Sequence, residues 1–230
     1  MVHGSATGLL AFQGKNVLEK FDNFISELIE NIGPFGTILI PAFSYSAGRG
    51  EDFTLDCESK VGGFSRLALK SKKFIRTYDP MFSWLVLGYN SYKFENVVFT
   101  SAFGKNSSFE LIESFNPMVL MLGVPISKGF TFIHRIEEKL GVSYRFHKTF
   151  NCKIHVSHQM QTIYYTYYVR KLEERYKCDL GSIEEEIVRL GIVKSIEKKL
   201  NIYTIDCVLF ENYVKEQIFN NKYLLIKNED

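Results

Sequence analysis

Proton transfer near neutral pH is the chemistry for which this sequence offers the clearest candidates, since imidazole titrates in that range and the chain has five histidines. His134 stands three residues before Glu137, and an i, i+3 pair shares one face of a helix. A carboxylate at that spacing can orient an imidazole and stabilise its charged form. His134 and Glu137 are therefore the candidate catalytic pair. An ordinary surface ion pair in the charged run 134–139 is the alternative.

Other common catalytic patterns are missing. The sequence contains no GxxxxGK[ST], no GxGxxG after a predicted strand, no HExxH and no GxSxG. Nucleotide hydrolysis, simple dinucleotide binding and a serine-hydrolase nucleophile therefore have no support. The four cysteines show no CxxC spacing, so we predict isolated, mostly buried thiols and no metal site.

The elements that must position His134 alternate between strands and helices. Apolar residues at helical spacing predict a helix over 16–32, ended by Gly33 and Pro34. His134 follows a predicted buried strand and a loop and opens a predicted helix, a usual place for a site in α/β proteins. We expect one domain over 1–230 of the α/β (α+β) class, with a central mixed sheet flanked by helices. Strands are predicted at 37–40, 82–88, 118–124 and 162–169, helices at 62–70, 132–140, 182–190 (with Ser182 as its cap) and 215–223, and a loop at 44–54.

The composition narrows the class of protein. The 230 residues include 46% hydrophobic and 23% charged residues, which excludes a mostly disordered chain. A formal net charge of +2 is too balanced for a dedicated nucleic-acid binder. No apolar run is long enough for a membrane span, and no signal peptide is evident, so we expect a cytoplasmic protein.

Several short segments follow one another along the chain: 2–5 (VHGS), 33–43 (GPFGTILIPAF), 59–62 (SKVG), 79–83 (DPMFS) with Gly88, 103–109 (FGKNSSF), 122–124 (LGV) with 131–137 (TFIHRIE), and 141–145 (GVSYR). In this order they resemble motifs of the aminoglycoside 3-N-acetyltransferase family, whose fold is unrelated to that of the GNAT acetyltransferases. From this resemblance we expect the chain to be N-terminally short relative to the family.

The resemblance implies transfer of an acetyl group from acetyl-CoA to an amino group of a sugar-containing substrate. His134 would be the general base that takes the amine proton, with Glu137 as its partner and with direct attack on the thioester. The turn of His3, Gly4 and Ser5, together with Ser83, would lie along CoA. Arg76, with the nearby lysines 70, 72 and 73, would meet CoA phosphates, although a solvated charged helix end is the alternative.

One departure from the family concerns the acceptor. Aminoglycoside-modifying members tend to carry acidic residues near 163–170, where this chain has IYYTYYVR. Tyrosines stack on sugars and donate hydrogen bonds, and arginine pairs with phosphate, so we predict acceptor contacts at Tyr165, Tyr167 and Arg170. A tyrosine-rich strand without a ligand is the alternative.

These observations favour an N-acetyltransferase acting on a nucleotide-linked or phosphorylated amino sugar in surface-polysaccharide biosynthesis. Two alternatives stay open: an aminoglycoside-resistance enzyme, and a catalytically silent homologue that serves as a binding subunit. We expect CoA and a small-molecule amino sugar as partners, with no nucleic acid and no metal. The sequence leaves the choice between a monomer and a homo-oligomer open.

Overall fold

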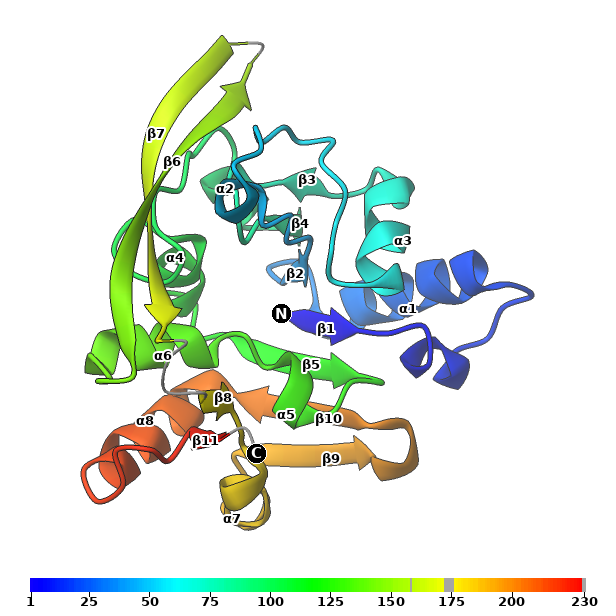
Figure 1. The fold of residues 1–230 in the computed structure, drawn as a ribbon. Helices are drawn as coiled ribbons and strands as arrows, with labels where there is room; N and C mark the ends of the chain where they lie inside the picture. The colour runs from blue at the N-terminus through cyan, green and yellow to red at the C-terminus, as the bar shows by residue number, and fades with distance from the viewer. Residues whose placement is uncertain (158, 172–175, 229–230) are drawn as a thin grey trace.

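The structure is a computed structural model that describes residues 1–157, 159–171 and 176–228. Within them, a four-stranded mixed sheet has the order β1-β5-β10-β9, with β1 parallel to β5 and the other pairs antiparallel. A three-stranded antiparallel sheet has the order β2-β4-β3. A long hairpin, β6-β7, extends beyond the sheets (Figure 1), and a short pair joins β8 to β11. The predicted mixed α/β class is confirmed.

The strands are β1 Val2–Gly4, β2 Thr37–Pro41, β3 Ile75–Arg76, β4 Trp84–Gly88, β5 Met118–Leu122, β6 Arg145–Val156, β7 Gln159–Arg170, β8 Tyr176–Cys178, β9 Val193–Glu197, β10 Ile202–Asp206 and β11 Ile226–Asn228. The α-helices are α1 Val17–Ile32, α2 Ser46–Arg49, α3 Gly63–Ser71, α4 Ser108–Glu113, α5 Ile126–Gly129, α6 Ile133–Leu140, α7 Glu184–Arg189 and α8 Cys207–Ile218. No helix in the described part of the chain is long and apolar enough to cross a membrane.

Helix α1 forms where the sequence predicts it. The side chain of Asn16 caps it by accepting the backbone N–H groups of Leu18 and Glu19 at 3.1 and 3.0 Å. Gly33, at φ 72°, ends it. The buried face of α1 packs with Ile38 and Ile40 of β2, whereas Leu39 belongs to the larger core on the other side of that strand. The prediction that strand 37–40 is covered on both faces is therefore confirmed.

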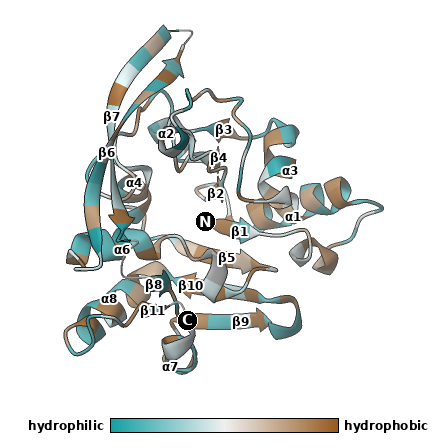
Figure 2. Ribbon diagram, in the orientation of Figure 1, coloured by the Kyte–Doolittle hydropathy of each residue, from teal (hydrophilic) through white to brown (hydrophobic). Residues whose placement is uncertain are grey.

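The hairpin was only half predicted. Strand β7 covers the predicted 162–169, but its partner β6 had no predicted counterpart, because its polar and basic residues give no clear apolar alternation. Figure 2 shows hydrophilic and hydrophobic stretches interspersed along both strands. Backbone bridges from Phe53 to Ile154 and from Ser101 to Thr166 attach the hairpin to the rest of the molecule.

Three local predictions were wrong. Residues 181–183 form a 3-10 turn before α7, and the Ser182 hydroxyl donates to the Leu224 carbonyl rather than capping a helix. The last helix, α8, runs from Cys207 to Ile218 instead of 215–223, because Asp206 caps it by accepting two backbone N–H groups at 3.0 Å. The predicted loop 44–54 contains the short helix α2.

Candidate active site

Helix α6 brings His134 and Glu137 together as their spacing predicts. Nδ1 of His134 lies 2.6 Å from Oε2 of Glu137. The Glu137 side chain is fully buried, whereas the His134 side chain is 22% exposed. Gly141, at φ 62°, ends the helix and turns the chain into β6. The imidazole therefore faces accessible space while its carboxylate partner lies in the protein interior.

Two further residues hold the Glu137 carboxylate. The Tyr144 hydroxyl donates to Oε1 at 3.0 Å, and Nε of Arg145 lies 2.9 Å from Oε2. Burial raises the pKa of Glu137, but its contacts with His134, Arg145 and Tyr144 together outweigh that effect, so that this pKa is lowered. Glu137 is therefore ionised at neutral pH.

His134 opens onto a pocket of about 530 Å³. Three of its lining side chains carry positive charge, and no carboxylate is among the described residues that line it. Cys178 is in the wall, and burial raises the pKa of its thiol to about 12, so the thiol is not an activated nucleophile. The pocket is lined by His134, Arg145, Phe146, Lys148, Phe150, Tyr167, Val169, Arg170 and Cys178.

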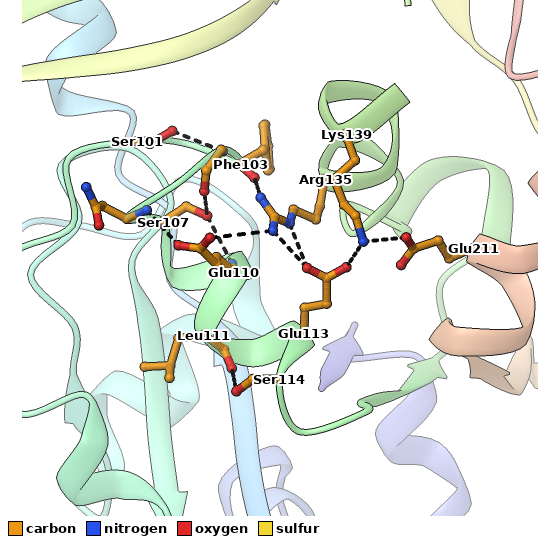
Figure 3. A network of polar contacts seen from close by, with 12 residues as sticks. Ser101, Phe103, Ser107, Glu110, Leu111, Glu113, Ser114, Arg135, Lys139 and Glu211 are labelled. Atoms are coloured by element: carbon orange, nitrogen blue, oxygen red, sulfur yellow. Dashed lines mark hydrogen bonds and ion pairs between the residues drawn. The ribbon is translucent and has the colours of Figure 1, made fainter. Parts of the chain in front are cut away.

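Phe103 packs against His134 from the protein interior, with ring centroids 5.3 Å apart in an edge-to-face arrangement. The Phe103 carbonyl accepts a 2.6 Å hydrogen bond from Arg135, which also pairs with Glu113 at 2.8 Å. Figure 3 shows Glu113 between Arg135 and Lys139. Lys139 also pairs with Glu211, so this network joins α4, α6 and α8 around the helix that carries His134.

None of His3, Gly4 and Ser5 lines the pocket with His134: His3 lies in the core, and Gly4 and Ser5 are partly exposed. His3 is 6% exposed, and its pKa is lowered to about 3 by burial and by the nearby N-terminal ammonium group. A Cβ on Gly4 would lie 2.6 Å from the Phe64 ring, which explains a glycine there without a ligand. The Ser5 hydroxyl donates to the Gly123 carbonyl at 2.7 Å. A CoA contact at these three residues stays a prediction.

The structure places Arg76 and Ser83 in a buried network of hydrogen bonds within the protein, and a CoA contact at these two residues stays a prediction. The Arg76 guanidinium donates to the carbonyls of Leu55 (2.8 Å), Ala42 (2.7 Å) and Cys57. Its Nε donates to the Ser83 hydroxyl at 3.2 Å, and Ser83 donates in turn to the Ala42 carbonyl at 2.8 Å. Ser83 is fully buried, and a phosphate at Arg76 would have to displace protein carbonyls.

The residues predicted to contact the acceptor divide between the pocket and the core. Tyr167 and Arg170 line the pocket with His134. Tyr165 is fully buried, and its hydroxyl donates to Oδ1 of Asp79 at 2.8 Å, so its contact with the acceptor stays a prediction without an exposed side chain to support it. Arg145 and Lys148 also line the pocket but were not predicted as site residues, although Arg145 belongs to the GVSYR segment that carries part of the family resemblance.

None of the other described histidines lines this pocket. His147 and His155 form ion pairs with Glu138 at 3.0 Å and Asp52 at 3.7 Å, and His158 lies outside the described residues. Across the described ranges, no group of three or more His, Cys, Asp or Glu side chains is arranged to hold a metal ion.

Comparison with known proteins identifies the class. A family model for aminoglycoside 3-N-acetyltransferase matches residues 1–205. The solved structure of aminoglycoside acetyltransferase AAC(3)-IIb has a TM-score of 0.74 at 17% identity, with 96% of this chain and 90% of that chain covered. The YokD protein from Bacillus subtilis has a TM-score of 0.73 at 15% identity, covering 96% and 86%.

A third similar structure is AAC-IIIb in a binary complex with CoASH, with a TM-score of 0.71 at 16% identity and coverage of 96% and 89%. No curated protein sequence matches significantly. The protein thus has the fold of the AAC(3) enzymes, which is not the GNAT fold. The chain belongs to the aminoglycoside 3-N-acetyltransferase family and is an acyltransferase.

Proposed function

We propose that this protein transfers an acetyl group from acetyl-CoA to the amino group of a nucleotide-linked or phosphorylated amino sugar, in the biosynthesis of a surface polysaccharide. The observation that carries the proposal is the His134–Glu137 pair at the edge of a positively charged pocket. Membership of the family and the CoA complex of AAC-IIIb support acetyl-CoA as the donor.

His134 supplies the base that the reaction needs, because a protonated amine has no lone pair for attack. Its Nδ1 faces Glu137, so Nε2 is the nitrogen left to take the proton from the amine. As the amine nitrogen bonds to the acetyl carbonyl carbon, the carbon–sulfur bond breaks. His134 then returns the proton to the sulfur, which leaves as the free thiol of CoA. Glu137 stabilises the imidazolium formed between these steps.

The charge of the pocket favours an anionic acceptor. Arg145, Lys148 and Arg170 line it, and none of its described lining residues carries a negative charge that would attract a polycation. Like charges brought together at a binding site cost several kcal/mol, about enough to exclude an aminoglycoside. Arginine binds phosphate through paired, charge-assisted hydrogen bonds, which suits Arg170 to a sugar phosphate or diphosphate.

The test compares two acceptor panels by following free thiol release from acetyl-CoA: amino sugars carrying phosphate or nucleoside diphosphate, and aminoglycosides. We expect turnover confined to the first panel. An Arg170→Gln variant should raise the KM for the phosphorylated acceptor at least tenfold, with a smaller change for the same amino sugar without phosphate. Turnover of aminoglycosides alone would overturn the assignment of the acceptor.

Acetylation of aminoglycosides is the second candidate, because the matching family model carries that description and a relative, AAC(3)-IVa, has been solved in complex with apramycin and with a gentamicin. A catalytically silent homologue is a third. It predicts no thiol release with either panel and no binding of CoA in calorimetry, whereas CoA binding without turnover would point to an acceptor outside both panels.

A further inference from the structure

The position of one proton follows from the contacts of His134. Nδ1 lies 2.6 Å from Oε2 of Glu137 and 2.9 Å from Nη2 of Arg145. A guanidinium can only donate, so a hydrogen bond from Arg145 would require an unprotonated Nδ1. That nitrogen would then direct its lone pair at a carboxylate oxygen 2.6 Å away. Nδ1 therefore carries the proton and donates it to Glu137.

The Glu137 oxygen that accepts this proton is shared with Arg145. Oε2 lies 2.6 Å from Nδ1 and 2.9 Å from Nε of Arg145. The Arg145 side chain is 6% exposed, and its Nη1 donates to the Tyr168 carbonyl at 3.1 Å, which fixes the guanidinium between α6 and β7. The carboxylate thus faces two potential cations at a single oxygen.

The charged groups that contact His134 or line its pocket come from α6 and from both strands of the hairpin, while the packed Phe103 ring contributes none. Helix α6 contributes Glu137, β6 contributes Arg145 and Lys148, and β7 contributes Arg170. Tyr167 and Cys178 are neutral at pH 7, since burial raises the pKa of both. Among the described groups at the site, Glu137 alone favours an imidazolium, while the arginines and Lys148 oppose it.

We propose that Arg145 is a positioning residue of the transfer reaction that keeps His134 unprotonated in the resting enzyme. It does so by pairing with the same Glu137 oxygen that orients the imidazole. A buried carboxylate 2.6 Å from Nδ1 with no other cation would bind the imidazolium tightly, and the base would be lost at neutral pH. With Arg145 in place, Glu137 orients the ring and still lets the proton leave. This inference rests on the proposed function of His134.

The test is the pH dependence of three variants: Arg145→Met, Arg145→Lys and the double variant Glu137→Gln/Arg145→Met. Two readouts are followed, the acidic limb of kcat/KM and the titration of the His134 ring by ¹⁵N NMR in the enzyme without substrates. In Arg145→Met, both should move to higher pH by about one unit or more. Activity at pH 7 should fall roughly tenfold and largely recover near pH 9. In Arg145→Lys, the acidic limb of kcat/KM should return to the pH of the wild type.

The double variant separates this effect from damage to the fold, because it removes the unpaired buried carboxylate together with the arginine. We expect His134 in the double variant to titrate at a lower pH than His134 in Arg145→Met. Arg135→Met is the matched control: it also removes a buried arginine paired with a carboxylate, but Glu113 does not touch His134. It should lower stability without moving the titration.

An unmoved or lowered His134 titration in folded Arg145→Met would overturn the inference, as would an equal shift in Arg135→Met. The NMR titration needs no turnover. If the wild-type protein acetylates nothing, the proposed function fails while the shift in Arg145→Met still decides whether Arg145 opposes protonation of His134.

Discussion

The hydroxyl of Tyr165 lies 2.8 Å from Oδ1 of Asp79, and neither side chain is exposed. Asp79 also accepts the backbone N–H groups of Met81 and Phe82 at 3.0 and 2.8 Å and the hydroxyl of Ser108 at 3.2 Å. Tyr165 therefore fixes β7 to the segment before β4, and two residues further along the same strand Tyr167 reaches the pocket. Tyr165 attaches the hairpin to the rest of the molecule, and Tyr167 lines the pocket that holds His134.

Substitution to phenylalanine should separate these two roles. Tyr165→Phe leaves Asp79 with one donor fewer, so we expect a loss of about 1–3 kcal/mol in the free energy of unfolding and an acceptor KM within twofold of the wild type. Tyr167→Phe should raise the acceptor KM about threefold to tenfold with little change in stability. Denaturant unfolding and steady-state kinetics measure both. An equal rise in KM for the two variants would contradict this division.

Asp79 should make stability depend on pH. Burial raises the pKa of Asp79 from 3.8 to about 6, against the opposing hydrogen bonds. The folded protein therefore holds this proton more tightly than the unfolded chain. Protonated Asp79 therefore stabilises the fold, fully below about pH 4. This contribution to the free energy of unfolding, about 3 kcal/mol for a pKa difference of about two units, is lost as pH rises through about 6.

Asp79→Asn removes this titration while keeping an oxygen for the N–H donors, and its amide can donate to Ser108. We expect the stability of Asp79→Asn relative to the wild type to increase between pH 4 and pH 7. Urea midpoints across that range measure it. If the difference in stability between the variant and the wild type stays constant with pH, Asp79 does not titrate between pH 4 and pH 7.

Arg76 should matter for stability and not for CoA. Arg76→Met removes hydrogen bonds to three backbone carbonyls and to Ser83, so we expect a loss of about 2–4 kcal/mol in the free energy of unfolding. The affinity for CoA, measured by calorimetry on the folded variant, should stay within about threefold, because the guanidinium is committed to protein groups. A tenfold loss of CoA affinity with unchanged stability would return Arg76 to the CoA site.

Local patterns in the sequence were sufficient for part of the fold and of the site. Asn16 and Gly33 mark the ends of α1, and the three-residue spacing of His134 and Glu137 places both on one face of α6. Each of these signals lies within one element, where helix geometry alone relates the residues. The same spacing predicted the contact between the imidazole and the carboxylate.

The features of the fold and site that were not predicted depend on contacts between segments far apart in the sequence. Tyr165 and Tyr167 share one face of β7, but Tyr165 is buried in the hydrophobic core and bonded to Asp79, 86 residues away in sequence. Arg76 is committed to carbonyls of loops that no periodicity places beside it. Arg145 reaches Glu137 because Gly141 turns the chain back from α6 into β6. Residue type alone could not assign these roles.

The most direct test of the account compares thiol release from acetyl-CoA by the wild type and by His134→Ala, with a phosphorylated amino sugar as acceptor and CoA affinity measured on both proteins. Loss of the base should lower kcat by about 10²–10⁴-fold, while CoA affinity changes by no more than a few-fold, because His134 acts on the proton of the amine. Full activity in a folded His134→Ala variant would contradict the assignment of His134 as the base and with it the proposed mechanism.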